Sequence, residues 1–131
     1  MSQPAAKQGD KVIAIDTHIV MIPSPGGPVP TPTPAPFSGE LSDNLSADVL
    51  MDNKQAATEG SVAMNSPEHV PVGGPFQKPP SNKGTIKSGS GGVLINNKKA
   101  ARTGDTATTC NDPADTAGGT VIGSGTVMIG D

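Results

Sequence analysis

The stretch that decides the fold is Lys99-Ala100-Ala101-Arg102-Thr103-Gly104-Asp105, because related phrases occur at two other places in the chain. The other copies are Pro4-Ala5-Ala6-Lys7-Gln8-Gly9-Asp10 and Gln55-Ala56-Ala57-Thr58-Glu59-Gly60-Ser61. The second copy begins 51 residues after the first, and the third begins 44 residues after the second. A repeat with unequal spacing indicates a supersecondary unit whose connecting loops vary in length.

The segments before the second and third copies also resemble each other. They are Val49-Leu50-Met51-Asp52-Asn53-Lys54 and Val93-Leu94-Ile95-Asn96-Asn97-Lys98. A short apolar strand, an Asp-Asn or Asn-Asn turn and a return strand of small residues are typical of a β-hairpin. Two of the three copies therefore predict a complete hairpin.

The two ends of the chain supply the third hairpin. The segment Val127-Met128-Ile129-Gly130-Asp131 is a strand with its turn but no return strand. Pro4 to Asp10, in contrast, is a return strand that no other strand precedes. We therefore expect residues 1–10 and 126–131 to lie as adjacent strands. The sequence predicts an all-β fold with threefold pseudo-symmetry that is closed by its own termini.

The repeated phrase resembles the signature of the PAAR-repeat proteins, in which a hydrophobic strand and an Asn/Gly turn precede Pro-Ala-Ala-Arg and Gly-Asp. The resemblance runs from end to end of the chain. It implies a small β-cone of three hairpin repeats with long Pro/Gly-rich loops and a metal near its apex. The residues that carry the motif are Pro4, Ala5, Ala6, Gly9, Asp10, Ala56, Ala57, Gly60, Ala100, Ala101, Arg102, Gly104 and Asp105.

Composition indicates one domain, residues 1–131, with a thin apolar core. Hydrophobic residues make up 33% of the chain, Trp and Tyr are absent, and Gly and Pro number 17 and 14. Such a composition lies close to that of disordered chains, so a loose Pro/Gly-rich chain is the alternative. The ordered repeats favour a folded domain, which then needs a metal, oligomerisation or docking on a larger body.

The Pro-rich run at residues 23–36 holds half of the prolines. We expect it to be an ordered strap in extended polyproline conformation on the surface of the domain. The alternatives are a flexible linker and an SH3-type ligand. The preceding residues 11–22 are rich in β-branched side chains and predict a strand. No segment predicts a helix of ordinary length.

The scarce metal-ligating residues share one register. His18 lies nine residues after Gly9, His69 lies nine residues after Gly60, and Cys110 lies six residues after Gly104. Equivalent loops converge on a threefold axis, so these side chains supply three ligands of a tetrahedral zinc site. Taken singly, each is more often an ordinary polar or buried side chain.

The resemblance also implies zinc, held by three His and one Cys near the apex. This chain departs from that pattern because it has no third His. We expect the fourth ligand of the single zinc ion to come from Asp112, Asp115 or water, unless the coordination is incomplete.

Charge and targeting signals restrict the partners. The net charge is −3 and the charges are scattered, which argues against nucleic acid. There is no signal peptide and no apolar run of membrane-spanning length. We expect the chain to be made in the cytoplasm, to carry no appended effector domain, and to leave the cell on the machine that fires it.

The resemblance implies a structural spike-tip protein of a contractile injection machine, such as a type VI secretion system or an extracellular particle. One copy would cap a trimeric VgrG-like or phage-hub-like spike and touch the target membrane transiently. The alternatives are an adaptor that recruits effector cargo through the strap and a simple zinc-binding module. An enzyme using Cys110 with His18 or His69 is disfavoured, because the chain offers little material for an apolar pocket.

Overall fold

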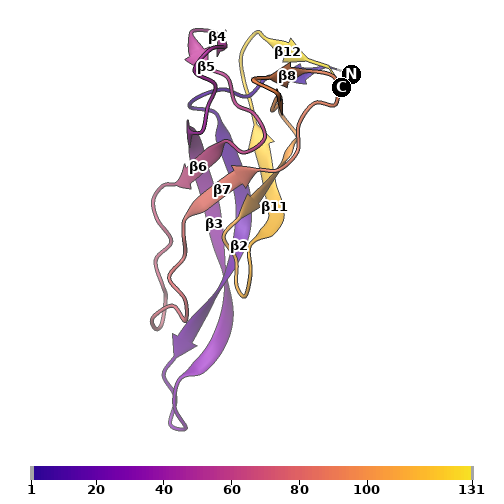
Figure 1. Cartoon of the computed structure of the whole chain (residues 1–131). Coiled ribbons are helices and arrows are strands. Elements are labelled where there is room, and N and C mark those ends of the chain that lie inside the picture. Colours follow the sequence, from indigo (N-terminus) through magenta and orange to yellow (C-terminus); the bar gives the residue numbers. More distant parts are fainter. Residues whose placement is uncertain (1, 131) are drawn as a thin grey trace.

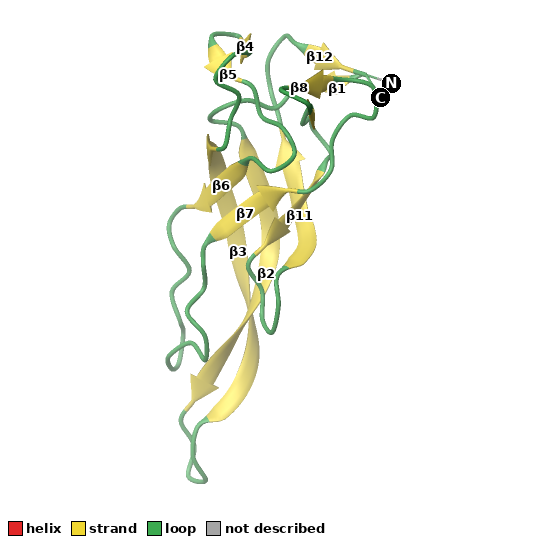
Figure 2. Cartoon of the chain, in the orientation of Figure 1, coloured by secondary structure: helices red, strands yellow, loops and turns green. Residues whose placement is uncertain are grey.

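The chain is all-β, as the sequence predicts. The computed structural model describes residues 2–130, and these residues form twelve β-strands without a helix (Figures 1 and 2). None of the described segments is a helix that is long and apolar enough to cross a membrane.

Six antiparallel strands close into a barrel, in the order β10-β11-β2-β3-β6-β7. This barrel was not predicted, because three of its strands have only four residues and carry too little alternation to be recognised. The strands are β2 (Lys11–Ile22), β3 (Val29–Asp43), β6 (Val62–Asn65), β7 (Lys83–Ile86), β10 (Thr106–Thr109) and β11 (Thr116–Ile122).

Three two-stranded hairpins lie together at one end of the molecule, beside both termini (Figure 1). They are β4 (Leu50–Met51) with β5 (Lys54–Gln55), β8 (Leu94–Ile95) with β9 (Lys98–Lys99), and β12 (Met128–Ile129) with β1 (Gln3–Pro4). The predicted pairing of the two chain ends is confirmed, because Gln3 lies opposite Ile129. The end residues of that prediction, Met1 and Asp131, lie outside the described residues.

The three phrases bind one another in a closed ring of backbone hydrogen bonds. The N–H of Ala6 donates to Ala101 at 2.9 Å, that of Ala101 to Ala57 at 3.0 Å, and that of Ala57 to Ala6 at 3.0 Å. All three alanines are fully or almost fully buried. A larger side chain at the second alanine of a phrase would meet this closely packed ring, which explains why the pair Ala-Ala recurs.

The turn that follows each ring alanine explains the invariant glycine and the following residue. Gly9, Gly60 and Gly104 have φ of +90°, +90° and +93°, in the region that favours glycine. In the first and third copies a carboxylate then accepts the N–H three residues earlier: Asp10 from Lys7 at 3.0 Å, and Asp105 from Arg102 at 2.8 Å.

In the second copy, both members of the charged pair are replaced together by uncharged residues, which we call the matched replacement. Lys7 and Arg102 also pair with Asp10 and Asp105 through their side chains, at 3.2 and 3.3 Å. In the second copy, Thr58 replaces the cation and Ser61 replaces the carboxylate, and Ser61 Oγ accepts the Thr58 N–H at 3.0 Å. Because both charges are absent together, no buried charge is left unpaired.

The β2–β3 hairpin continues far beyond the barrel (Figure 1). β11 pairs with β2 only at residues 11–13 of β2, whereas β3 pairs with the whole length of β2. We call this extension, residues 17–36, the prong. Its tip lies at the end of the molecule opposite the three hairpins and the termini (Figure 1).

The predicted polyproline strap is wrong, because residues 29–36 form the first half of β3. Prolines occupy every second position, at 30, 32, 34 and 36, opposite residues 21, 19, 17 and 15 of β2. In an antiparallel ladder alternate N–H groups point away from the partner strand, so these prolines remove no hydrogen bond to β2. They leave the outer edge of the prong without donors, which discourages pairing with another strand.

Replacing Ser61 with Ala tests the matched replacement. Ser61 is fully buried, and its Oγ also donates to the Asn44 carbonyl at 2.8 Å. We expect the free energy of unfolding to fall by about 1–3 kcal/mol, because the N–H of the buried Thr58 and the Asn44 carbonyl both lose their partner. Urea denaturation measures it. The exposed Ser42→Ala variant is the control, and an equal effect of the two substitutions would contradict the assignment.

Candidate metal centre

β2 places two of the candidate ligands. Alternate residues of this strand point into the molecule, and Val12, Asp16, His18 and Val20 on that face are all buried. Asp16 and His18 are two residues apart, so both side chains lie on the same face. They are 0% and 1% exposed, at the point where the prong leaves the barrel.

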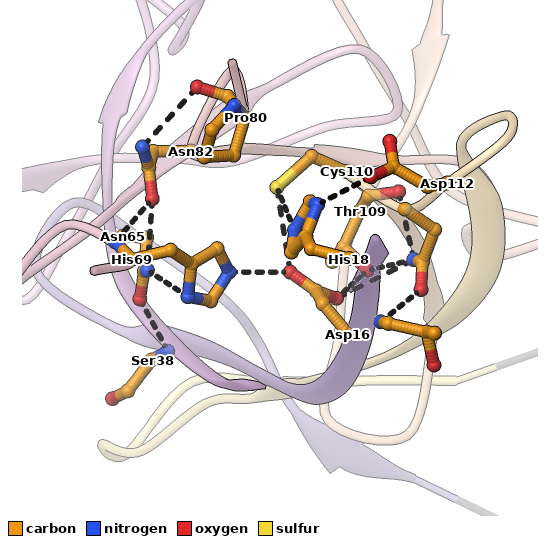
Figure 3. Close-up of polar contacts among 12 residues, drawn as sticks. Asp16, His18, Ser38, Asn65, His69, Pro80, Asn82, Thr109, Cys110 and Asp112 are labelled. Carbon is orange, nitrogen blue, oxygen red and sulfur yellow. Dashed lines mark hydrogen bonds and ion pairs between the residues drawn. The ribbon is translucent and has the colours of Figure 1, made fainter. Parts of the chain in front are cut away.

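The other two candidates come from the segments on either side of the prong. Cys110 directly follows β10, and His69 lies in the β6–β7 loop. An asparagine pair fixes His69: the Asn82 side-chain oxygen accepts the His69 N–H at 2.9 Å and the Asn65 amide at 3.1 Å. Figure 3 shows the resulting arrangement, with His18, His69 and Cys110 turned towards the carboxylate of Asp16.

The ligand atoms of these four residues all lie within 4.8 Å of one another. Asp16 Oδ2 is 2.9 Å from His69 Nε2 and 3.4 Å from Cys110 Sγ, and Cys110 Sγ is 3.6 Å from His18 Nε2. Ligands bound tetrahedrally at about 2.0–2.3 Å lie about 3.3–3.8 Å apart. The cluster can therefore hold one metal ion after side-chain shifts of up to about an ångström.

The structure brings the three sequence-predicted ligands together and supplies a different fourth residue. Asp16 completes the cluster, whereas Asp112 lies one layer further out and the exposed Asp115 takes no part. The sequence prediction missed Asp16 because it started from the two histidines and the cysteine. The signal that can find it is its position two residues before His18 on a predicted strand.

Asp112 lies beside the ring nitrogen of His18 that faces away from Cys110. Its Oδ2 lies 3.5 Å from His18 Nδ1 and accepts the Ile19 N–H at 2.8 Å. His18 Nδ1 is buried and has no closer partner. A carboxylate at this position favours the tautomer with the proton on Nδ1, which leaves the Nε2 lone pair free for a metal.

Asp16 is held in place before any ion binds. Its Oδ1 accepts the Thr109 hydroxyl at 2.5 Å and the Asn111 amide at 3.4 Å, while its Oδ2 faces His69 and Cys110. These bonds satisfy a carboxylate that is fully buried. The same contacts also make the cluster a self-sufficient polar network when no metal is present.

Burial raises the pKa of the Cys110 thiol to about 11, and the negative charge of Asp16 acts in the same direction. The Asn82 N–H and the Ser81 hydroxyl oppose the shift. The thiol therefore stays protonated near neutral pH, which makes it a poor nucleophile. A metal ion that binds Cys110 must displace this proton.

Comparison with known proteins identifies one family. The family model of the PAAR motif matches residues 76–131, which include the third phrase and Cys110. No curated protein and no solved structure matches the chain significantly. The match confirms, over the C-terminal part of the chain, the resemblance that the three phrases indicate.

The raised thiol pKa predicts how the metal-free protein responds to alkali. Between pH 9.0, the ordinary value, and about 11, the thiol of the unfolded chain ionises while that of the folded chain does not. The unfolded chain then binds fewer protons, so stability falls as pH rises through this window.

Urea denaturation of the chelator-treated protein on both sides of that window measures the loss. Cys110→Ser is the matched variant and should lose less stability over the same interval, because it has no thiol to ionise. Equal losses in the two proteins would contradict the assigned direction.

Proposed function

We propose that this chain, whose residues 76–131 match the PAAR motif, is a PAAR-repeat protein of a contractile injection system and caps a trimeric VgrG-like or hub spike. One copy would sit on one trimer through the end that carries the three hairpins, with the prong pointing towards the target envelope. The chain would be made in the cytoplasm and leave the cell on the particle. Its role would be mechanical rather than catalytic.

The observation that carries this proposal is a set of three exposed side chains at equivalent positions. Leu50, Leu94 and Met128 begin β4, β8 and β12, and they are 60%, 61% and 52% exposed. The next residue of each strand is buried instead. Strand alternation therefore turns one large apolar side chain outward from each hairpin. We call these three residues the anchor triad.

The hairpins that carry the anchor triad are fixed to one another. The Asp52 carboxylate in the turn of one hairpin accepts the Thr126 hydroxyl at 2.8 Å, in the segment before the next. In the same way, Ser46 donates to Asn96 at 2.5 Å and Ser90 donates to the Gly130 carbonyl at 2.7 Å. Each turn thus binds the segment that leads into a neighbouring hairpin.

This arrangement suits a trimeric partner. A trimer presents the same surface three times around its axis, and a single chain can match it only with three similar contacts. The anchor triad provides such contacts from one chain, on hairpins that the ring of phrases holds together. The apolar anchors supply affinity, since an exposed aliphatic side chain is favourably removed from water.

We propose zinc as the metal of the Asp16–His18–His69–Cys110 cluster. One thiolate, two imidazoles and a carboxylate are a ligand set that suits zinc, and a closed set of four protein ligands is typical of a structural site. The bound ion would supply cross-linking free energy that the thin apolar core lacks. Asp16 and His18 would thereby hold the root of the prong to the loops of His69 and Cys110.

The contacts favour the structural role over the alternatives. Asp16, His18 and Cys110 are buried, and the side chain of His69 is only 3% exposed. The Cys110 thiol is kept protonated, so these residues favour a closed metal site over a nucleophile. In the Pro-rich segment that an adaptor would use, residues 29–36 are paired to β2. No comparable observation supports cargo recruitment by that segment.

Titration of the chain against a purified trimeric spike tests the capping. Binding should saturate at one chain per trimer. Changing all three anchors, in Leu50→Ser, Leu94→Ser and Met128→Ser combined, should weaken binding about a hundredfold or more, because three apolar contacts are lost.

A matched control changes three equally exposed apolar residues elsewhere, Ile15, Val70 and Val72, to Ser. It should bind as the parent does. Three chains per trimer, or equal losses in the two triple variants, would refute this docking face.

Elemental analysis tests the metal. Protein purified without chelators should contain about one zinc per chain. Asp16→Asn and Cys110→Ser should each lower both the zinc content and the thermal midpoint, whereas Asp115→Asn, at an exposed acid outside the cluster, should change neither. A parent protein without bound metal would remove zinc from the account.

A further inference from the structure

The distal end of the molecule carries almost no charge. Residues 17–39, which include the whole prong, contain no Asp, Glu, Lys or Arg, and this is the longest such stretch of the chain. The one ionisable side chain in it, His18, is 1% exposed and belongs to the metal cluster. Residues 69–77 of the β6–β7 loop are also free of these four residue types.

This loop segment lies against the prong. The Met21 N–H donates to the Pro75 carbonyl and the Gln77 N–H donates to the Ile19 carbonyl, both at 2.8 Å. Figure 1 shows the β6–β7 loop descending beside the prong. The uncharged surface therefore belongs to two segments that are joined by hydrogen bonds, and not to one strand alone.

The most exposed large apolar side chains lie on or beside these segments. Val70, Val72 and Ile15 are 74%, 73% and 69% exposed, and Val29, next to the tip, is 48% exposed. Val70 and Val72 line a hollow together with Pro34 and Pro36 of the prong. Glu68 is the one Asp, Glu, Lys or Arg in the lining of this hollow. Exposed apolar groups with so few neighbouring charges can leave water at little electrostatic cost.

The edges of the prong have few free backbone donors. On the β2 edge, the N–H of Thr17 donates to Asn111 at 2.7 Å and that of Ile19 to Asp112 at 2.8 Å, as Met21 does to Pro75. On the β3 edge, the outward positions are prolines, which have no N–H. An unsatisfied N–H is costly in an apolar medium, and this construction removes that cost along both edges.

From these observations we infer that the prong tip enters the interfacial region of a lipid bilayer without any need for anionic lipid. The inference rests on the proposed function, because the spike would carry the tip to the envelope. The carbonyls of the outer β3 edge keep the tip at interfacial depth, since nothing in the hydrocarbon core can donate to them. Charged residues at the prong root limit how far it enters: Glu68 lines the hollow with Pro34 and Pro36, and Lys78 pairs with Asp112, which accepts the Ile19 N–H.

A single tryptophan can report the contact, because the native chain has neither Trp nor Tyr. Gly26 lies at the tip and Gly91 lies before β8 at the opposite end, and an added side chain meets open space at both. The Gly26→Trp and Gly91→Trp variants are mixed, without any spike, with vesicles of phosphatidylcholine alone or mixed with phosphatidylglycerol. Emission wavelength and quenching by brominated lipid are measured at low and high salt.

We expect Gly26→Trp to shift to shorter wavelength and to be quenched equally in both lipid mixtures and at both salt concentrations. Gly91→Trp should do neither. Adding Val29→Lys to Gly26→Trp should weaken vesicle binding about tenfold, because a charge must then leave water. Loss of the response by this variant with an unchanged circular dichroism spectrum supports the inference.

Three results would overturn it: no shift of Gly26→Trp, a shift only with phosphatidylglycerol, or equal shifts of the two tryptophans. Titration of the Gly26→Trp variant, which keeps Val29, against the spike separates this inference from the proposed function. Capping that persists while vesicle contact is absent contradicts the lipid inference alone. Vesicle contact without capping contradicts the proposed function alone.

Discussion

The ring of backbone hydrogen bonds among Ala6, Ala57 and Ala101 is the constraint on which the rest of the structure depends. It joins three segments that lie far apart in the sequence, and it does so at a place where only small side chains fit. Each segment leads from its ring alanine through a glycine with positive φ. The direction in which β2, β6 and β10 begin follows from this geometry.

The ring also compensates for a composition that is poor in large apolar residues. One buried cluster lies inside the barrel around Val12, Phe37 and Leu41, and a second lies under the hairpins around Met51, Ile95 and Ile129. Both are small, so hydrogen bonds and polar contacts must carry much of the order. The molecule then divides its chemistry along its length: apolar anchors at one end, a buried ligand cluster in the middle, and an uncharged prong at the other end.

Much of this was readable from the sequence where a pattern was both local and repeated. The predicted strand 11–22 coincides with β2, the three hairpins follow from the phrases, and His18, His69 and Cys110 do meet. The failures have physical causes. The prolines of residues 29–36 argued against a strand, yet their alternation places each missing N–H on the outer edge. Asp16 was missed because a carboxylate is common, and what marks this one in the sequence is its position two residues before His18 on the predicted strand.

X-ray absorption at the zinc edge, on the chain purified without added metal or chelator, tests most directly the claim that one buried ion braces the prong. The account predicts a single sulfur neighbour at about 2.3 Å and three nitrogen or oxygen neighbours at about 2.0–2.2 Å, with no open position for water. A spectrum without sulfur, or one of a hydrated ion, would show that Cys110 and its neighbours form only a polar network and would contradict the account.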